Sequence, residues 1–453
     1  MRLLHLSDIH FKAPDCLQPL IDPERPYRTR LKADLVALCA EKAVDAILVS
    51  GDIAFKGHPD EFAVAYAWLK ELAAASGCPT DRIYVVPGNH DVDRSVCKGS
   101  MAIANAQAAI ANANHLRREA VLRTQLNDPD SGLALFKPLA AYNAFASPLG
   151  CFVSPAQPYW YYNLDDLGGG VTLRLHGLTS TLISGLEDRD DQPGRLYLSP
   201  LQTVLDPEPD VLNLVMSHHP PRWFLDEHAV DDAVNDRAPL QFFGHEHRQR
   251  CIATDGYMRF TAGAVNPERH EHDWKPGYNV IDIEVLGQGK DRVVQVCAHV
   301  RQLQKNPERF IALTTKQGQD VWVQNILFPS HATHVVRPTE AQPAQAAAAA
   351  QVAPAAPAHI ATPAEVAMSS PSTKGLVFRF WNLPDSQKRE IMLNLKLITQ
   401  EDLVLSDEEL YNRGLRLPAK RAGHAFIQRD DAPVPSLCWA MRELGNGRPV
   451  RRP

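Results

Sequence analysis

The sequence predicts a protein of the α/β class, in which strands and helices alternate along the chain and pack in layers. Short runs rich in Val, Ile and Leu alternate with segments of helical pattern. Polar clusters containing His, Asp and Asn directly follow several of these runs, and open α/β sheets place their sites at such strand ends. The 453 residues are 45% hydrophobic and 22% charged, which is ordinary globular usage and allows two or three domains.

The first part of the chain alternates between strand and helix. Short apolar runs predict strands at residues 3–6, 46–49 and 83–86. Helical patterns between these runs predict helices at residues 27–41 and 60–76. Residues 94–146 are rich in Ala, keep a helical pattern and contain no convincing strand. We therefore expect a helical insertion there, in a position to form a cap.

The rest of the chain divides into a second set of strands, a linker and a helical end. Strand-like segments lie at residues 171–175, 212–216, 241–243, 259–261 and 278–285. Between residues 338 and 373, 20 of 36 residues are Ala or Pro, which predicts a semi-stiff linker. Helices are expected at residues 385–397 and 406–417. The predicted units are a first domain at 1–330, the linker, a helical domain at 374–445 and a solvated tail at 446–453.

Charge differs between the two predicted domains. Residues 1–337 carry 33 basic and 41 acidic side chains, a net charge of −8, whereas residues 374–453 carry 14 and 10, a net charge of +4. The whole chain has a net charge of −6. It is therefore no polycation built to coat nucleic acid, although a nucleic-acid substrate is not excluded.

The cysteines and the apolar runs indicate the compartment. The eight Cys are widely scattered, with no Cys-x-x-Cys pair, which is typical of reduced thiols in an intracellular protein. The apolar start of the chain is too short for a signal peptide, and no run approaches the roughly 18 apolar residues of a membrane span. We expect a cytoplasmic protein without a membrane segment and without disulfides.

Five polar clusters sit at the ends of predicted strands. They are Ser7-Asp8-Ile9-His10, Ser50-Gly51-Asp52, Pro87-Gly88-Asn89-His90-Asp91, Ser217-His218-His219-Pro220 and Gly244-His245-Glu246-His247. A single buried His is more often a hydrogen-bonded core residue than a ligand. Because five apolar strands each deliver ligand-type side chains at their carboxyl ends, where open α/β sheets place their sites, we favour a shared site.

The residue types predict a centre with two metal ions. In Asp8-x-His10 and His245-x-His247 the partners are two residues apart, so they can converge on neighbouring coordination positions. The Asp52 carboxylate has two oxygens and can bridge two cations about 3.5 to 4 Å apart. Mixed His, Asp and Asn ligands suit Mn, Fe or Zn better than Mg or Ca. Two such ions clamp a phosphate and lower the pKa of a bound water.

The five motifs, in this order, resemble the calcineurin-like metallophosphoesterase superfamily over about residues 1–300. The resemblance implies a four-layer α/β/β/α sandwich with the helical cap, and two divalent transition-metal ions, Mn before Fe, Zn, Co or Ni. It implies one ion held by Asp8, His10, Asp52 and His247, and a second held by Asp52, Asn89, His218 and His245. It also implies that His90 is catalytic, that Asp91 orients the His90 imidazole, and that His219 supports the ligands from behind.

Several further residues have weaker claims. His270 and His272 have ligand-like spacing, but a solvated loop is the better interpretation. His58 could lie near the substrate, although a plain loop residue is favoured. Basic residues of the insertion could meet a phosphate chain or belong to ordinary helix surface, which is slightly favoured: Arg94, Lys98, Arg117, Arg118 and Arg123.

The substrate class is less specified than the chemistry. The third motif ends in Asp91, where phosphoprotein phosphatases of this fold usually have Glu, so the sequence resembles the phosphodiesterase and repair-exonuclease branches. We expect a phosphodiester hydrolase acting on nucleic acid or nucleotides, either a nuclease or a cyclic nucleotide phosphodiesterase. The alternatives are a phosphomonoesterase acting on phosphoproteins or small molecules, and a scaffold without catalysis.

The region at 374–445 resembles the small helical adaptor domains of bacterial signalling and conflict effectors, including those associated with GTPases. The pattern includes Phe378, Phe380, Trp381 and Leu383, followed by charged helical segments. The resemblance implies a protein partner, such as a signalling ATPase or GTPase, recruited through this domain. The linker would then tether the enzyme to that partner. The alternative is a helical domain that merely docks on the catalytic core.

Overall fold

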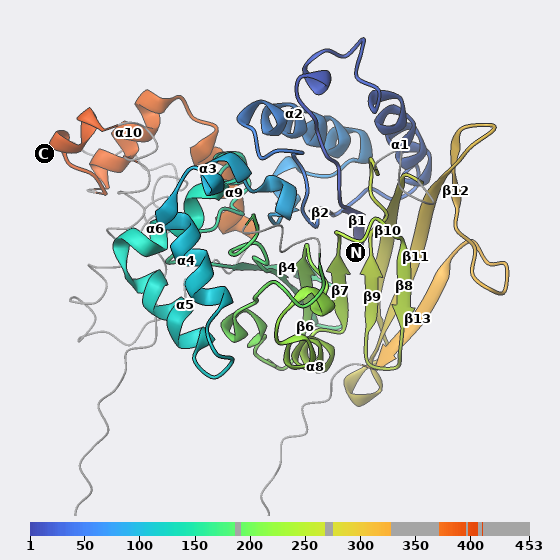
Figure 1. Cartoon of the computed structure of the whole chain (residues 1–453). Coiled ribbons are helices and arrows are strands. Elements are labelled where there is room, and N and C mark those ends of the chain that lie inside the picture. Colours follow the sequence, from blue (N-terminus) through green and yellow to red (C-terminus); the bar gives the residue numbers. More distant parts are fainter. Residues whose placement is uncertain (186–191, 268–274, 328–370, 396, 406–409, 411–453) are drawn as a thin grey trace, which may run out of the picture.

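Two β-sheets packed face to face form the centre of the molecule (Figure 1). The computed structural model describes residues 1–185, 192–267, 275–327, 371–395, 397–405 and 410. Helices lie on the outer faces of both sheets, so the predicted α/β/β/α sandwich is confirmed.

The first sheet contains the strands that begin the chain. Its order is β12-β11-β10-β1-β2-β3, with β13 paired to β11. Its parallel strands are β1 (Arg2–Leu6), β2 (Ala46–Val49) and β3 (Ile83–Val85). The antiparallel strands are β10 (Gly277–Leu286), β11 (Val293–Gln304), β12 (Arg309–Ala312) and β13 (Trp322–Leu327). Since β1, β2 and β3 run in parallel, their carboxyl ends meet at one edge of the sheet.

The second sheet has the order β4-β5-β6-β7-β9-β8. Its parallel strands are β5 (Thr172–Gly177), β6 (Val211–Ser217), β7 (Leu240–Phe243) and β9 (Met258–Thr261). The strands β4 (Trp160–Asp166) and β8 (Arg250–Ala253) pair antiparallel at its two edges. The carboxyl ends of β6 and β7 therefore lie side by side, as those of β1 to β3 do.

Helices α1 (Arg25–Leu38) and α2 (Pro59–Ser76) lie over the first sheet, and α8 (Glu227–Arg237) lies against the second (Figure 1). Helix α2 begins with Pro59, a residue favoured in the first turn because its missing N–H would be unpaired there anyway. It ends before Gly77, whose φ of 73° is the left-handed conformation that closes many helices. The helices predicted at 27–41 and 60–76 are thus present, with shifts of a few residues at most.

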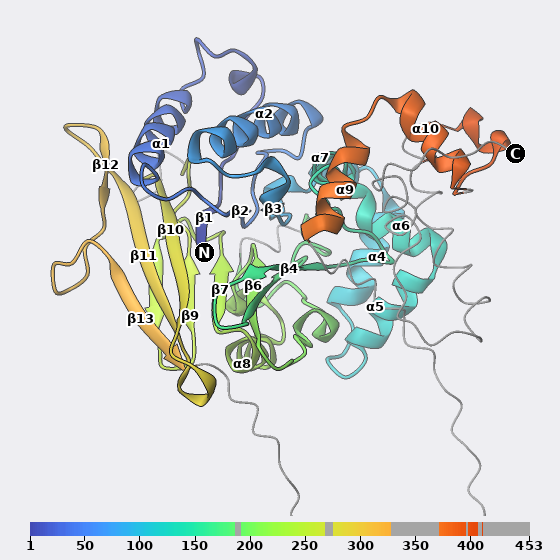
Figure 2. The same cartoon turned by 180° about the vertical axis from the view of Figure 1, so that it is seen from behind.

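Residues 94–146, all of them described, form the predicted helical insertion without any strand. Its helices are α3 (Arg94–Lys98), α4 (Met101–Ala111), α5 (Arg118–Asn127), α6 (Pro129–Phe136) and α7 (Ala140–Ala146). Side chains of Asp93, Ser100 and Asp128 accept hydrogen bonds from the first turns of α3, α4 and α6, which satisfies backbone N–H groups there. The insertion lies on the side of the sandwich opposite β11 to β13 (Figure 2).

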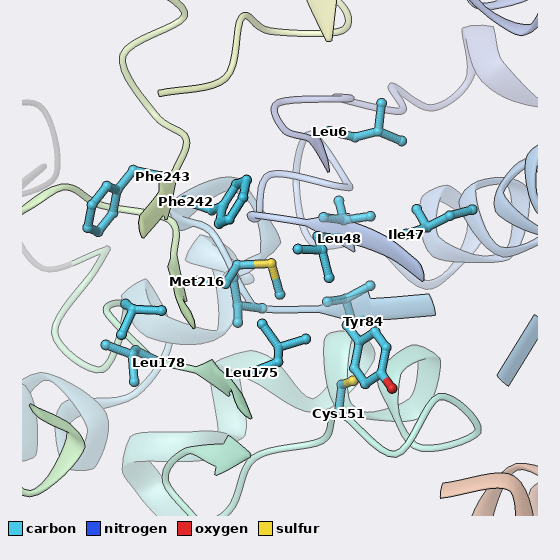
Figure 3. Close-up of a cluster of buried hydrophobic side chains, with 14 of the residues drawn as sticks. Leu6, Ile47, Leu48, Tyr84, Cys151, Leu175, Leu178, Met216, Phe242 and Phe243 are labelled. Carbon is cyan, nitrogen blue, oxygen red and sulfur yellow. The ribbon is translucent and has the colours of Figure 1, made fainter. Parts of the chain in front are cut away.

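The main hydrophobic core lies between the two sheets (Figure 3). Leu48 from the first sheet and Met216 and Phe242 from the second are fully buried. The His5 ring packs edge-on against Phe242 at 4.8 Å, joining the two sheets directly. Burying this apolar surface is the main favourable term that holds the strand ends in place.

The sequence missed several strands. These are β4, β8, β11, β12 and β13. Most of them have partly exposed side chains, and β8 is buried on neither face, so they lack the continuous apolar run of a central strand. Strand β11 alternates buried and half-buried residues in the period of two that a half-covered strand requires.

The described part of the C-terminal region, residues 371–395 and 397–405, is mainly helical, as predicted. It contains α9 (Pro371–Trp381), α10 (Asp385–Asn394) and the 3₁₀ helix η9 (Gln400–Val404). Helix α9 was not expected and begins three residues inside the predicted linker, and α10 ends before the predicted residue 397. The helix predicted at 406–417 falls almost wholly outside the described residues. Among the helices that are described, none has the length and apolar character needed to cross a bilayer.

Replacing Leu48 by Ala tests how much the inter-sheet core contributes. Leu48 is 0% exposed, so Leu48→Ala should lower the free energy of unfolding by about 2 to 5 kcal/mol, measured by urea denaturation. The matched control is Leu133→Ala on α6, where the side chain is 45% exposed and the change should stay within about 0.5 kcal/mol. Equal effects of the two substitutions would contradict the placement of the core.

Candidate metal centre

The five predicted clusters meet at one place in the structure. Asp8, Asp52 and Asn89 follow the carboxyl ends of β1, β2 and β3, and His218 and His245 follow those of β6 and β7. Both sheets therefore contribute to one edge of the sandwich. Asp8, Asp52, Asn89 and His218 are each at most 3% exposed.

Asp52 lies at the middle of this cluster. Its Oδ2 is 3.3 Å from His10 Nε2 and 3.2 Å from His218 Nε2. Its Oδ1 accepts a hydrogen bond from the backbone N–H of His90 at 2.8 Å. One carboxylate thus touches side chains from β1 and β6, which belong to different sheets.

The remaining ligand-type atoms form two groups around Asp52. Asn89 Oδ1 lies 3.0 Å from His218 Nε2 and 3.1 Å from His245 Nδ1. On the other side, Asp8 Oδ1 lies 3.2 Å from His247 Nε2. Candidate ligand atoms of Asp8, His10 and His247 lie within 4.8 Å of one another, as do those of Asp8, Asp52 and His218. The structure thus brings together all seven residues predicted as ligands.

Backbone carbonyl groups fix the orientation of three histidines. In each of them, Nδ1 lies near a backbone carbonyl oxygen. The distance is 2.8 Å from His218 to Ser50 and 2.8 Å from His90 to Phe55. It is 3.4 Å from His10 to Asn266. A carbonyl can only accept a hydrogen bond, so Nδ1 carries the proton in each ring. Nε2 then keeps its lone pair in the neutral imidazole, and in His10 and His218 this atom faces Asp52.

The backbone is strained at the ligand positions. Five of these residues have positive φ angles between 50° and 68°, a left-handed conformation that costs free energy for any residue except glycine. They are Asp8, His10, Asp52, His245 and His247. Each follows a strand of the core, so the packing of the sheets holds a conformation that an isolated loop would avoid.

The buried charges of the cluster stabilise each other. Burial opposes ionisation of Asp52, yet the charge of His218 and His90 holds the pKa of this carboxyl well below its usual range. Burial likewise opposes protonation of His218, but the Asp52 carboxylate raises its pKa to about 9. A desolvated carboxylate of this kind needs a positive partner, and a divalent cation can replace the proton on the neighbouring imidazole.

The donor set fits two divalent cations. Asp8 Oδ1 is buried and accepts no hydrogen bond within the described residues, although it lies beside His247. Around it and Asp52 are imidazole nitrogens and one amide oxygen, the mixture that borderline transition-metal ions prefer. A buried carboxylate oxygen without a hydrogen bond is costly, and a cation at this position would satisfy it.

Asp91 does not orient His90 as expected. The Asp91 carboxylate accepts hydrogen bonds from the backbone N–H groups of Ile53, Ala54 and Gly88, at 2.8 to 2.9 Å. Its partner is thus the loop that carries Asp52, and the Phe55 carbonyl orients His90 instead. The expectation failed because adjacent residues on a tight turn point their side chains in different directions.

His90 lies at the edge of the cluster and is partly exposed. Its ring is 4.8 Å from that of His10 and stacks on Phe55 at 5.1 Å. Burial lowers the pKa of His90, and the negative charge of Asp52 opposes this shift. His90 is therefore beside the candidate ligands and within reach of solvent.

His219 lies directly behind His245, with 4.4 Å between the ring centroids. Its Nδ1 is 2.8 Å from Ser180 Oγ, while Nε2 is buried and has no hydrogen-bond partner in the described part of the chain. The ligand-type nitrogens of His218, His219 and His245 also lie within 4.8 Å of one another. The supporting role of His219 stays a prediction.

Residues that the sequence analysis did not select also shape the site. Trp223 packs edge-on against His245 at 4.6 Å, and the guanidinium group of Arg222 lies 4.3 Å above the Trp223 ring. Arg222 Nε pairs with Glu246 at 2.7 Å, which ties the loop after β7 to the one after β6. Only the position of Trp223 shortly after the fourth motif could have drawn attention to it.

The structure describes several of the weaker candidates. The His58 side chain is 59% exposed and lies 3.7 Å from Asp60. His270 and His272 lie outside the described residues. In the insertion, Arg118 bonds to Asp226 and Arg123 bonds to Glu119, which supports a packing role for these two basic residues.

Substituting Gly88 tests whether the close approach of two loops is needed for metal binding. A Cβ atom on Gly88 would overlap the Asp52 carboxylate and backbone, so Gly88→Ala should displace Asp52. We expect at least about a tenfold loss of Mn²⁺ affinity, measured by titration calorimetry. Gly256→Ala is the control, because a Cβ there meets no atom within 4 Å. Unchanged affinity in Gly88→Ala would contradict the assignment of Asp52.

Several known proteins are similar to parts of this chain. A probable cyclic nucleotide phosphodiesterase of Rhodococcus erythropolis is 38% identical over 95 residues, which is 20% of this chain and 29% of that protein's own length. Vps29 of Chaetomium thermophilum aligns with 73% of this chain and 100% of its own, at 13% identity and a TM-score of 0.28. A putative 5′-nucleotidase of Staphylococcus aureus aligns with 62% of this chain and 50% of its own, at 12% identity and a TM-score of 0.30.

Two family models match the sequence. The model for GTPase-associated adaptor domains matches residues 372–422, the region predicted to be an adaptor. The model for calcineurin-like phosphoesterases matches residues 1–249, which is more than half of the 453 residues and contains all five motifs. The chain therefore belongs to the calcineurin-like phosphoesterase family, and its residues 372–422 are similar to GTPase-associated adaptor domains.

Proposed function

We propose that this protein hydrolyses phosphodiester bonds in nucleic acid or nucleotides, as a nuclease or cyclic nucleotide phosphodiesterase that depends on two metal ions. The observation that carries the proposal is the position of Asp52, a buried carboxylate shared between two groups of ligand-type side chains. Membership of a phosphoesterase family supports the same reaction.

Asp8, His10, Asp52 and His247 would hold one cation, and Asp52, Asn89, His218 and His245 the other. The mixed ligand set favours Mn²⁺, with Fe, Zn, Co or Ni as alternatives. When bound, two such ions supply positive charge to the phosphate oxygens and lower the pKa of a nearby water.

His90 is oriented to donate a proton to the leaving oxygen of the substrate. The Phe55 carbonyl accepts the Nδ1 proton of His90, and the Phe55 ring supports the imidazole by stacking. A proton on Nε2 is then the one available to the leaving oxygen. Because burial lowers the pKa of His90, its protonated form is a stronger acid than an exposed imidazolium. Asp91 contributes by holding the Asp52 loop rather than by contacting this imidazole.

A diester substrate of the nucleotide type is supported by two observations. The segment of 38% identity belongs to a protein named as a probable cyclic nucleotide phosphodiesterase. The third motif ends in Asp91, where phosphoprotein phosphatases of this fold usually have Glu, and in this feature the chain resembles the phosphodiesterase and exonuclease branches. The Asp91 carboxylate, which is shorter than that of Glu, accepts three backbone hydrogen bonds.

We further propose that the C-terminal adaptor domain recruits a protein partner, such as a signalling ATPase or GTPase, to the phosphoesterase domain. The match to GTPase-associated adaptor domains supports this role. The proposed boundaries are those predicted, 1–330 and 374–445. None of the cysteines in the described ranges forms a disulfide, which fits the proposed cytoplasmic location.

Removing the His90 imidazole tests the proposed proton donor. His90→Ala should lower kcat for a diester by about 10² to 10⁴-fold while the bound Mn²⁺ stays unchanged, since His90 is not among the proposed ligands. The measurements are steady-state kinetics and metal analysis. His58→Ala serves as the control, because this side chain is 59% exposed. If kcat were unchanged in His90→Ala, another group would donate the proton.

A Mn²⁺-supplemented substrate panel tests the substrate class. It compares bis-(p-nitrophenyl) phosphate with the monoester, cyclic nucleotides, single- and double-stranded DNA, RNA and a phosphopeptide. We expect turnover of diesters that is lost in His90→Ala. Turnover confined to the monoester or the phosphopeptide would show a phosphomonoesterase instead and overturn the proposal.

A further inference from the structure

Helix α9 of the adaptor region lies against the phosphoesterase domain. It contacts β4 and the 3₁₀ helix η2 (Thr80–Arg82), and both views show it beside the cap helices (Figures 1 and 2). A Cβ atom on Gly375 would lie 3.1 Å from Asp81 Oδ2, so the α9 backbone is in close contact with η2 at this residue. More than 200 residues of sequence separate the two surfaces, so chain connectivity alone does not explain their contact.

Lys374 is the most unusual residue of this contact. It is 1% exposed, although lysine side chains are almost never fully buried unless they are paired. Its Nζ donates a hydrogen bond to the carbonyl oxygen of Ile83 in β3. It also lies 3.3 Å from the centroid of the Tyr84 ring and 5.5 Å from that of Tyr162.

The surroundings of the ammonium group explain how it can be buried. A carbonyl oxygen and the faces of two aromatic rings attract a cation, so they replace part of the lost hydration. Burial still lowers the pKa of Lys374 to about 8, and Cys151 and Asp81 oppose that shift. Burying an ammonium group costs free energy, so its presence here indicates a specific contact. A contact made only by nonspecific apolar packing would not include a charged side chain.

The same helix also belongs to the adaptor. Val377 packs into the main core of the phosphoesterase domain, whereas Phe380 packs with Met392 and Leu410 in a separate C-terminal core. Helix α9 thus contributes side chains to both cores. A movement of the adaptor relative to the sandwich would have to pull Lys374 and Val377 out of their sites.

We propose that α9 is a docking helix, anchored by Lys374 in the pocket of Ile83, Tyr84 and Tyr162, that holds the adaptor domain at a fixed position on the phosphoesterase domain. A partner bound by the adaptor is then held at a defined place relative to the metal centre. The strand that receives Lys374, β3, continues directly into Asn89 and His90.

Amine labelling of the intact full-length protein tests the docking without any substitution. A brief pulse of an amine-reactive acetylating reagent is followed by digestion and mass spectrometry. Docking predicts that Lys374 reacts at least about tenfold more slowly than Lys32 and Lys42, whose side chains are 38% and 47% exposed. Labelling of Lys374 as fast as these two lysines would overturn the proposal.

A charge reversal provides the second test. Lys374→Glu places an anion beside a carbonyl oxygen and two ring faces, so it should release α9. We expect hydrogen exchange in α9 and in β3 to accelerate at least about tenfold, with β6 and β7 unchanged. Arg379→Glu is the control, because Arg379 lies on the exposed side of the same helix. Equal exchange in Lys374→Glu and in the wild type would contradict the anchoring role.

Discussion

The structure depends on one buried carboxylate, that of Asp52, which is where the two sheets meet. Its oxygens contact His10 from the first sheet and His218 from the second, so the site exists only while the sandwich is packed. Two glycines permit this approach: a Cβ on Gly51 would lie 2.6 Å from His218 Nδ1, and one on Gly88 would overlap Asp52 itself. The geometry of the ligand side chains therefore depends on the hydrophobic packing of the two sheets.

The free energy of the core also maintains the unfavourable features of the site. Five ligand positions have left-handed backbones, and two carboxylates are buried together with several imidazoles. Each of these features costs free energy by itself, of order 1 to 3 kcal/mol for a strained backbone. Strain and buried charge cluster where a protein binds ligands, because there the binding free energy or the packing compensates them. Backbone carbonyls then orient the imidazoles, so that little reorganisation remains when a substrate arrives.

Most of the candidate ligands could be predicted from the sequence, because their residue types are typical of metal ligands and they follow recognisable strands. The central strands and helices were found for the same reason: their apolar runs are continuous or have a clear period. Partners that are backbone carbonyls, such as those of Ser50 and Phe55, leave no trace in residue type. The true contacts of Asp91 depend on turn geometry, and edge strands such as β8 lack an apolar pattern. The burial of Lys374 depends on a contact with a distant segment, and an exposed lysine would look the same in the sequence.

The most direct test of the central claim is the number and position of metal ions around Asp52. A crystal of the full-length protein grown with Mn²⁺ should show two anomalous scattering peaks on either side of the Asp52 carboxylate. One peak should lie among Asp8, His10 and His247, and the other among Asn89, His218 and His245. A single peak, or peaks that do not involve Asp52, would contradict the two-metal centre and the mechanism built on it.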